Sequence, residues 1–182
     1  ITACNQMDGV IVPTEFTKQV LTNTGYCQTE ITVIPESFPD ELIIDESIKK
    51  KNFLRTKTKR NFLLFGQLTA PDAQDDRKNT EYAIKWFCET FSDRKDVGLV
   101  IKTNMGTNST IDRRVSFNKL SQVVKHHREG RFPKVTLLHG DLNEKTLLNL
   151  YLDKSLVGLI SATRGEGFGL PMLEAAACGL PV

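Results

Sequence analysis

Short apolar runs alternate with longer segments of helical spacing along most of the chain. From residue 61 onward the apolar runs predict strands at residues 61–65, 97–101, 135–138 and 156–160. Apolar residues recurring every three or four positions predict helices over residues 78–91, 111–128, 143–150 and 171–178. Strands that are nearly all apolar are buried on both faces, and their alternation with helices favours a parallel sheet. The pattern therefore predicts an α/β fold with a parallel sheet flanked by helices.

The amino-terminal part has a shorter version of the same pattern. Residues 9–12 and 31–34 predict two short strands, and residues 14–24 between them have the spacing of a helix. Thr14 is suited to cap the start of that helix, and Gly25 is suited to end it.

A polar, lysine- and arginine-rich stretch separates these two regions and is typical of a linker. We therefore predict three parts: residues 1–34, a linker over residues 35–60, and the sheet domain over residues 61–182. Residues 179–182 resemble a helix end followed by a new strand. We expect the sheet domain to be incomplete at its carboxyl end.

Composition changes this picture little. A net charge of +2 implies no strongly charged partner, so no nucleic acid is expected. The four cysteines lie far apart and form neither a zinc motif nor a disulfide framework, which favours a cytoplasmic setting. No apolar stretch approaches the roughly 20 residues of a membrane-spanning helix. Peripheral contact with anionic lipid, through the basic run at residues 49–60, stays open as an alternative to a solvated linker.

The segment most suggestive of chemistry is LISATRGEGFGLPMLEAAACGLPV, residues 159–182. It predicts a strand that enters a glycine-rich turn and then a helix starting near Pro171. Backbone N–H groups at such a helix start suit a phosphate or sugar hydroxyls. Glu166 and Glu174 could accept hydrogen bonds from hydroxyl pairs of a sugar or ribose. The alternative is that the glycines are ordinary turn residues and Glu174 a surface residue.

The whole string EGFGLPMLE is more specific than a glycine-rich turn, and it resembles the E-x7-E signature of retaining, family-four GT-B glycosyltransferases (glycosyl transferases group 1). Other strings also resemble that family: DGVIVPTEFTKQVL, ITVIPESF, FLLFGQL, RKN and VTLLHGDLNEKTLLNLY. The first two are similar to the family's hinge region and the rest to its carboxyl-terminal donor-binding domain. The resemblance implies a Rossmann-like donor domain over residues 61–182, with residues 1–34 as hinge and remnant of the acceptor domain.

The resemblance also implies roles for single residues. Glu166 would contact the donor sugar near its reacting face and is the catalytic candidate, and Glu174 would hold the ribose hydroxyls. Loop positions expected around the sugar are Gly165, Gly167, Phe168, Gly169 and Leu170. Further expected donor contacts are Gly66, Gln67, Arg77, Lys78, His139, Gly140 and Asp141.

Within that second set, Lys78, with Arg77 beside it, would neutralise the diphosphate. The turn His139–Asp141 would meet the nucleobase. Gln67 stands where many family members have arginine, so we expect phosphate binding to rest on Lys78, with Arg77 as a second candidate.

Several other residues have two interpretations. Lys102 ends a predicted strand on the ligand side and is a candidate second anion contact. Asp75 and Asp76 do not form a D-x-D metal clamp and are expected to be solvated, so neither a metal nor another cofactor is expected. His126 and His127 are likewise expected on a solvated face, and Trp86 is expected in the core.

Three functions follow from these patterns. The first is half of an enzyme that binds a nucleoside-diphosphate sugar and, with an acceptor domain, transfers the sugar to a saccharide or a lipid-linked saccharide. We expect that enzyme in the cytoplasm, with the inner face of a membrane as an alternative location. The second is a nucleotide-sugar-binding fragment without transferase activity. The third is a phosphorylase or another GT-B enzyme that is not a transferase.

Overall fold

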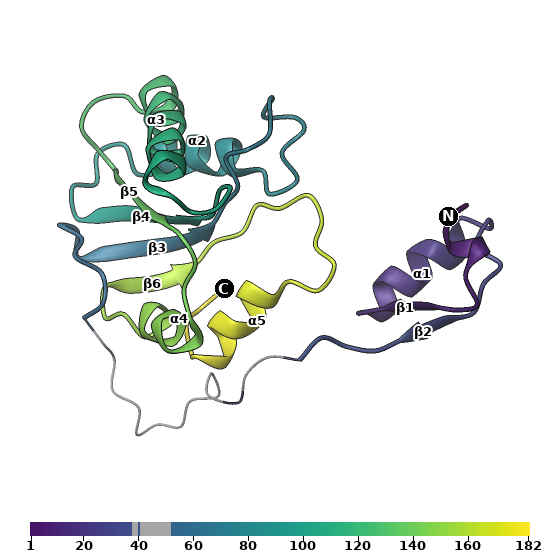
Figure 1. Ribbon diagram of the computed structural model, residues 1–182. Helices are drawn as coiled ribbons and strands as arrows, with labels where there is room; N and C mark the ends of the chain where they lie inside the picture. Colours follow the sequence, from purple (N-terminus) through teal and green to yellow (C-terminus); the bar gives the residue numbers. More distant parts are fainter. Residues whose placement is uncertain (38–39, 41–51) are drawn as a thin grey trace. The chain divides into compact units, whose positions relative to one another are not determined.

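The computed structural model describes residues 1–37, 40 and 52–182 (Figure 1). The chain divides into two compact units. The first contains Ile1–Phe38 together with Glu166–Leu170, and the second contains Pro39–Gly165 together with Pro171–Val182. A two-stranded sheet organises the first unit, and a four-stranded sheet organises the second.

The first unit is a small strand–helix–strand arrangement. Its elements are a 3₁₀ turn η1 (Cys4–Gln6), β1 (Val10–Val12), α1 (Glu15–Asn23) and β2 (Ile31–Val33). The strands pair in parallel, as a connection through a helix allows. Thr14 caps α1 by accepting a hydrogen bond from the backbone N–H of Thr17 at 3.1 Å, and Gly25 follows the helix with φ of +70°. Both predicted helix boundaries are confirmed.

The second unit is built on a parallel sheet with the strand order β5-β4-β3-β6. Its strands are β3 (Arg60–Phe65), β4 (Val97–Thr103), β5 (Lys134–His139) and β6 (Leu156–Leu159). Its helices are α2 (Thr80–Thr90), α3 (Thr110–His127), α4 (Glu144–Tyr151) and α5 (Leu170–Ala177). Every neighbouring pair of strands is parallel, so the predicted α/β fold is confirmed.

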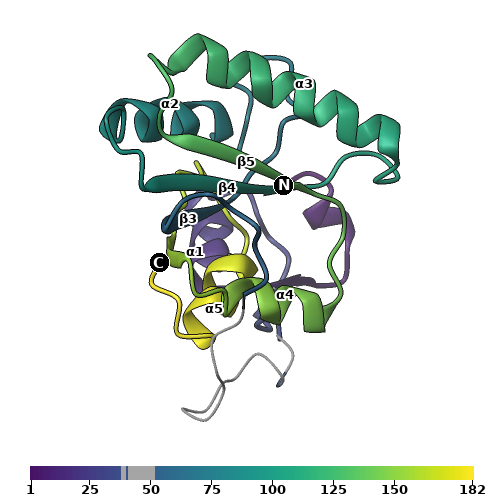
Figure 2. The ribbon, with the colours of Figure 1, turned by 90° about the vertical axis from the view of Figure 1, so that its left-hand side faces the viewer.

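Helices cover both faces of this sheet. Figures 1 and 2 show α2 and α3 on one face and α4 and α5 on the other. The central strands are therefore buried on both sides: Leu63, Leu64 and Leu99 are almost fully inaccessible to solvent. The main apolar cluster lies between β3, β4, α2 and α3, and Ile84 and Phe87 of α2 are part of it.

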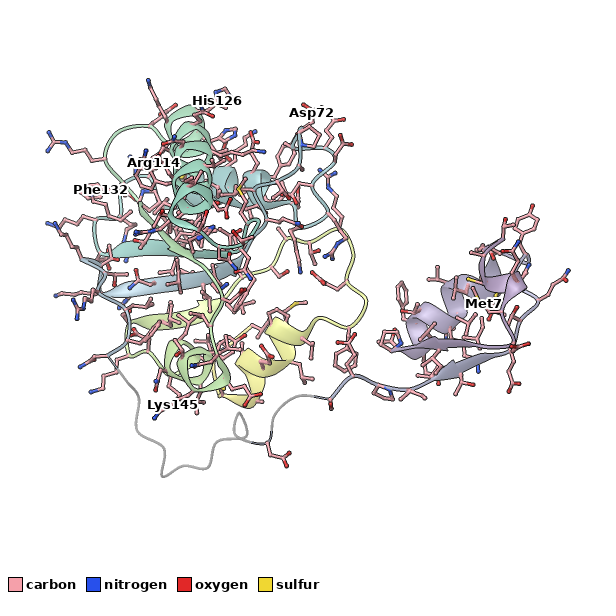
Figure 3. The ribbon with its side chains drawn as sticks, in the orientation of Figure 1. Met7, Asp72, Arg114, His126, Phe132 and Lys145 are labelled. Carbon is pink, nitrogen blue, oxygen red and sulfur yellow. The ribbon has the colours of Figure 1, made fainter. Side chains whose placement is uncertain are left out.

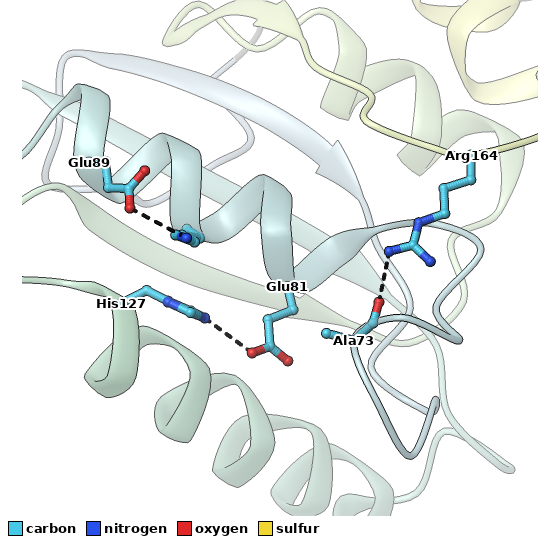
Figure 4. Close-up of polar contacts among 6 residues, drawn as sticks. Ala73, Glu81, Glu89, His127 and Arg164 are labelled. Carbon is cyan, nitrogen blue, oxygen red and sulfur yellow. Dashed lines mark hydrogen bonds and ion pairs between the residues drawn. The ribbon is translucent and has the colours of Figure 1, made fainter.

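Two predictions about helix faces were wrong. Trp86 is 50% exposed and packs against the ring of Tyr82 at 5.9 Å, because α2 directs Ile84 and Phe87 to the sheet instead. His127 is not solvated: its Nε2 lies 3.1 Å from Glu81 Oε1 and links α3 to α2 (Figure 4). The interpretation of His126, labelled in Figure 3, as a solvated residue is confirmed, since its side chain is exposed.

The predicted linker lies partly outside the described residues, as do the lysines at positions 49–51. Its later part contacts the second unit, because the backbone N–H groups of Phe53 and Leu54 both donate to Asp153 Oδ2 at 2.7 Å. No helix within the described ranges has the length and apolar content needed to cross a membrane.

Candidate functional site

A cavity of about 310 Å³ lies where β3 and β4 end. Its walls come from those strand ends, the loop before α2 and the first turn of α5: Phe65, Gly66, Gln67, Lys78, Lys102, Thr103, Asn104 and Pro171. Ligands of open parallel sheets bind beyond the carboxyl ends of the strands. Lysines are the only ionisable lining residues, so the cavity favours an anionic ligand.

The floor of the cavity is formed by the tight exit of the chain from β3. The Gly66 N–H donates to the Lys102 carbonyl at 3.0 Å, and the Gln67 N–H donates to Thr80 Oγ1 at 2.9 Å. A Cβ atom on Gly66 would lie 2.6 Å from Thr80 Cγ2. Only glycine lets the strand end come this close to the start of α2, which explains the residue type at this predicted contact.

Lys78 is positioned by its neighbour Asp76. The Asp76 carboxylate accepts hydrogen bonds from the backbone N–H of Lys78 at 2.9 Å and from that of Thr80 at 2.6 Å. Asp76 is only 5% exposed, so the expectation that it is solvated was wrong. The physical reason is that the carboxylate replaces the missing side-chain cap of Asn79, whose backbone is left-handed with φ of +54°.

Arg77 and Arg164 connect this loop to the start of the glycine-rich segment. Arg77 Nη1 donates to the Gly165 carbonyl at 2.6 Å, and the Arg164 N–H donates to the Arg77 carbonyl at 2.9 Å. The Arg164 guanidinium binds the carbonyls of Ala73, at 3.2 Å, and Gln74 (Figure 4). Arg77 is thus engaged with the backbone of the loop, which leaves Lys78 as the lining cation on this side of the cavity.

The opposite wall carries a polar network that starts at Lys102, which is 7% exposed. The Lys102 ammonium donates to Asn104 Oδ1, and Asn104 Nδ2 donates to Asp141 Oδ1. Asn108 Nδ2 donates to the other Asp141 oxygen at 2.6 Å. Burial lowers the pKa of Lys102, and the nearby charge of Asp141 opposes that shift. Asp141 therefore contacts two asparagine side chains in this network.

The other residues of the predicted nucleobase turn follow β5. Gly140 has φ of +107°, a conformation that favours glycine, and its N–H donates to the Thr103 carbonyl at 3.1 Å. His139 Nε2 is buried and has no hydrogen-bond partner within the described part of the chain. The turn thus lies beside the end of β4, at the same edge of the sheet as the cavity.

The two glutamates of EGFGLPMLE are placed differently. Glu174 lies one turn beyond the cavity residue Pro171 in α5, and its Oε2 accepts a hydrogen bond from the Tyr151 hydroxyl at 2.8 Å. Glu166 and the loop residues Gly167, Phe168, Gly169 and Leu170 belong to the first unit. Gly165 belongs to the second. The second unit by itself therefore brings together Gly66, Gln67, Lys78 and Lys102, but not Glu166.

Sequence reasoning missed several residues that shape the site. Tyr151 and Asp76 act through partners that no local pattern identifies, and the same holds for the carbonyl groups that Arg164 binds. Asn104 could have been found, because it follows β4 at the same edge that singled out Lys102. No group of three or more His, Cys, Asp or Glu side chains suited to a metal ion occurs within the described ranges.

Comparisons with known proteins identify a family and a shared fold. Residues 49–182 match the family described as "Glycosyl transferases group 1". Among solved structures, the chain is similar to the trehalose-6-phosphate synthase OtsA, with a TM-score of 0.61 and 12% identity over 94% of this chain and 42% of that chain. An apo structure of OtsA gives a TM-score of 0.57 and 12% identity over 94% of this chain and 43% of that one.

The N-terminal domain of a Candida albicans trehalose-6-phosphate phosphatase is also similar, with a TM-score of 0.58 and 11% identity over 94% of this chain and 41% of that chain. At these identities the likeness shows a shared fold. The chain spans less than half the length of these structures. A search of curated protein sequences found no match.

Proposed function

Because the chain belongs to the glycosyl transferases group 1 family, we propose that it forms the donor side of a retaining glycosyltransferase. It binds a nucleoside-diphosphate sugar and, with an acceptor-binding domain, transfers the glycosyl group to a saccharide or lipid-linked saccharide hydroxyl. The observation that carries this proposal is the cavity at the ends of β3 and β4, where Lys78 and Lys102 lie with the first turn of α5.

In this proposal the diphosphate occupies the lysine-lined cavity. Lys78 supplies the charge on the α2 side and Lys102 supplies it from the end of β4. A helix start such as that of α5 adds N–H groups and partial positive charge that favour an anion. Lys102 is held largely out of water, where an ammonium attracts a phosphate more strongly than it does at an exposed site.

The rest of the donor is assigned from the family resemblance. Glu174 accepts the ribose hydroxyls, and the turn His139–Asp141 meets the nucleobase. Glu166 and the backbone amides of residues 167–170 hold the sugar. This assignment is consistent with the strand order, since the ends of β3, β4, β5 and β6 all lie at one edge of the sheet.

Transfer breaks the bond between the anomeric carbon and the diphosphate. The oxygen of the acceptor hydroxyl bonds to that carbon on the same face of the sugar, and the hydroxyl proton passes to the departing diphosphate. Negative charge grows on the departing diphosphate, where Lys78, Lys102 and the start of α5 stabilise it. Positive character grows on the sugar ring, and the Glu166 carboxylate stabilises and orients it. These interactions are stronger in the transition state than with bound donor, so they accelerate the reaction.

Calorimetry with nucleosides and nucleoside diphosphates of uridine, guanosine and adenosine tests the donor site. We expect Lys78→Ala to weaken diphosphate binding about tenfold or more, which corresponds to a charged hydrogen bond of roughly 1.5–3 kcal/mol. Nucleoside binding should be unchanged, and the loss should grow at low salt. Lys85→Ala is the matched control, because Lys85 is a lysine of α2 that does not line the cavity and pairs with Glu89 at 3.9 Å. Equal losses for both variants would refute the diphosphate assignment.

Isotope exchange distinguishes transfer from binding alone. The full chain, together with an acceptor-binding domain and a panel of saccharide acceptors, is incubated with a sugar nucleotide and the labelled free nucleoside diphosphate, so that reversal of the transfer can place the labelled diphosphate on the sugar. A glycosyltransferase that breaks the anomeric bond reversibly moves label into the sugar nucleotide. Tight donor binding without any exchange would identify a nucleotide-sugar-binding module instead.

A further inference from the structure

Tyr151 is a buried tyrosine whose hydroxyl faces the donor-binding helix. It is the last residue of α4 and is 2% exposed. Its ring packs at 6.0 Å from the ring of Phe65, and Phe65 itself lines the cavity at the ends of β3 and β4. A tyrosine this buried needs a hydrogen-bond partner for its hydroxyl.

That partner is the second glutamate of the glycosyltransferase signature. The Tyr151 hydroxyl lies 2.8 Å from Glu174 Oε2 and 3.4 Å from the Pro171 carbonyl oxygen. A phenol has one hydrogen to donate, and the shorter contact to the carboxylate takes it, since charged acceptors form the stronger bonds. Burial raises the pKa of Tyr151, and its hydrogen bond to Glu174 raises it further. The hydroxyl therefore remains a donor throughout the physiological pH range.

A glutamate side chain has three rotatable bonds, and holding one of its oxygens restricts all of them. With Oε2 bound to Tyr151, fewer orientations of the carboxylate relative to α5 remain accessible. The structure contains no bond to Oε1 among the residues it describes. One oxygen is thus used to orient the group, and the other is presented as an acceptor.

We propose that Tyr151 is a positioning residue for ribose recognition, which fixes the Glu174 carboxylate so that Oε1 accepts the hydroxyl pair of a nucleoside-diphosphate donor. This inference rests on the proposed function, in which Glu174 holds the ribose. Tyr151 itself does not touch the ligand. It lowers the conformational entropy that Glu174 would otherwise lose on binding.

The test is the affinity for a ribose against a deoxyribose ligand. The diphosphates of uridine, guanosine and adenosine are titrated calorimetrically against the full chain, and the tightest is compared with its 2′,3′-dideoxy counterpart. Tyr151→Phe keeps the ring and removes only the hydroxyl. We expect it to weaken binding of the ribose ligand about three- to tenfold and to leave the dideoxy ligand unchanged.

Two further variants separate positioning from general damage. Tyr82→Phe is the matched control, since it removes a hydroxyl from a tyrosine of the same unit that packs against Trp86 and Arg164. It should change neither affinity. On a Glu174→Ala background, Tyr151→Phe should have no further effect on ribose selectivity, because the residue acts through that carboxylate.

A measurement on the unmodified chain gives a second readout. Tyrosine ¹³Cζ signals report the state of the hydroxyl, and the chain has three tyrosines to assign. The ribose ligand should shift the Tyr151 signal more than the dideoxy ligand does, because the Tyr151 hydroxyl and the ribose hydroxyls bind the same Glu174 carboxylate. Identical shifts with the two ligands would overturn the positioning role.

The outcomes distinguish this inference from the function on which it rests. If Glu174→Ala abolishes ribose selectivity and Tyr151→Phe preserves it, the inference fails and the proposed function stands. Equal weakening of both ligands by Tyr151→Phe would show a structural role and also overturns the inference. If the unmodified chain binds no nucleoside diphosphate, the proposed donor site fails as well.

Discussion

The loop from β3 to α2 and the loop from β4 to α3 both leave a central strand at the same edge of the sheet, and both start a helix on the same face. They differ in how the first N–H groups of the helix are satisfied. In the first loop, the buried carboxylate of Asp76 accepts from Lys78 and Thr80. In the second, Ser109 and Asp112 form an exposed capping box in which each side chain accepts from the other's backbone N–H.

The two caps differ in how many cavity-lining residues depend on the loop that contains them. The β3–α2 loop sets the backbone of Lys78 and the close approach of Gly66 to Thr80, so small movements there would displace two lining residues of the cavity. The β4–α3 loop contributes its lining residue, Asn104, before the cap begins. A buried cap therefore supports the proposed diphosphate site, and an exposed cap mainly starts a helix.

Removal of the buried cap should have the largest effect. Asp76→Ala leaves the N–H groups of Lys78 and Thr80 without their acceptor in a region where water does not enter easily. We expect a loss of about 2–4 kcal/mol in the free energy of unfolding. Urea denaturation measures it, with Asp75→Ala as the control, because the Asp75 side chain is exposed. Similar losses for the two variants would contradict a special role for Asp76.

A methyl group at Gly66 should have the next largest effect. Its Cβ would lie 2.6 Å from Thr80 Cγ2, and Thr80 cannot easily rotate because its Oγ1 binds the Gln67 N–H. We expect Gly66→Ala to lower the free energy of unfolding by about 1–3 kcal/mol, as overpacking does. Gly165→Ala is the control in the same denaturation experiment, since no atom lies within 4 Å of its added Cβ. A neutral Gly66→Ala would mean that the strand end and α2 are not in rigid contact.

The two loops also show how much of the fold could be predicted from the sequence. Periodicity located every strand and helix of the second unit, and the apolar strands predicted the parallel sheet. It placed the start of α2 at residue 78, whereas the helix begins at Thr80. Left-handed Asn79 and the buried Asp76 set that boundary, and burial of one aspartate in a charged loop depends on the folded surroundings rather than on local pattern.

The residues of the site that lie near the carboxyl end of a strand could be predicted from the sequence. The family resemblance implied Gly66, Gln67 and Lys78, the end of a predicted strand indicated Lys102, and all four line one cavity. Arg164 and its loop acceptors are 90 or more residues apart in sequence, and Tyr151 is 23 residues from Glu174. Contacts across such distances arise from the packing of whole elements, so no spacing along the chain reveals them.

Removal of the exposed cap should have a smaller effect than either change at the β3–α2 loop. Ser109→Ala deletes the oxygen that accepts from the Asp112 N–H at 3.2 Å. We expect a loss of about 1 kcal/mol, typical of an N-cap serine. Ser121→Ala, an exposed change within α3, controls for the higher helix propensity of alanine and should not destabilise. A loss as large as that of Asp76→Ala would remove the distinction between the two loops.

The smallest effect expected is a pH dependence of the exposed cap. Hydrogen bonds from the Ser109 side chain and backbone, and then those from Thr107, hold the pKa of Asp112 below its ordinary value of 3.8. A carboxyl group whose pKa is lower in the folded chain stabilises the fold above pH 3.8, and this contribution is lost as the pH falls through the folded-state pKa. Thermal unfolding is measured at a series of pH values between roughly pH 7 and pH 2. At neutral pH the unmodified chain should be more stable than Asp112→Asn. The gap should narrow in acid, because protonation removes the charge that the variant already lacks. A gap that stays constant with pH would show that the shape of the side chain, and not its charge, starts α3.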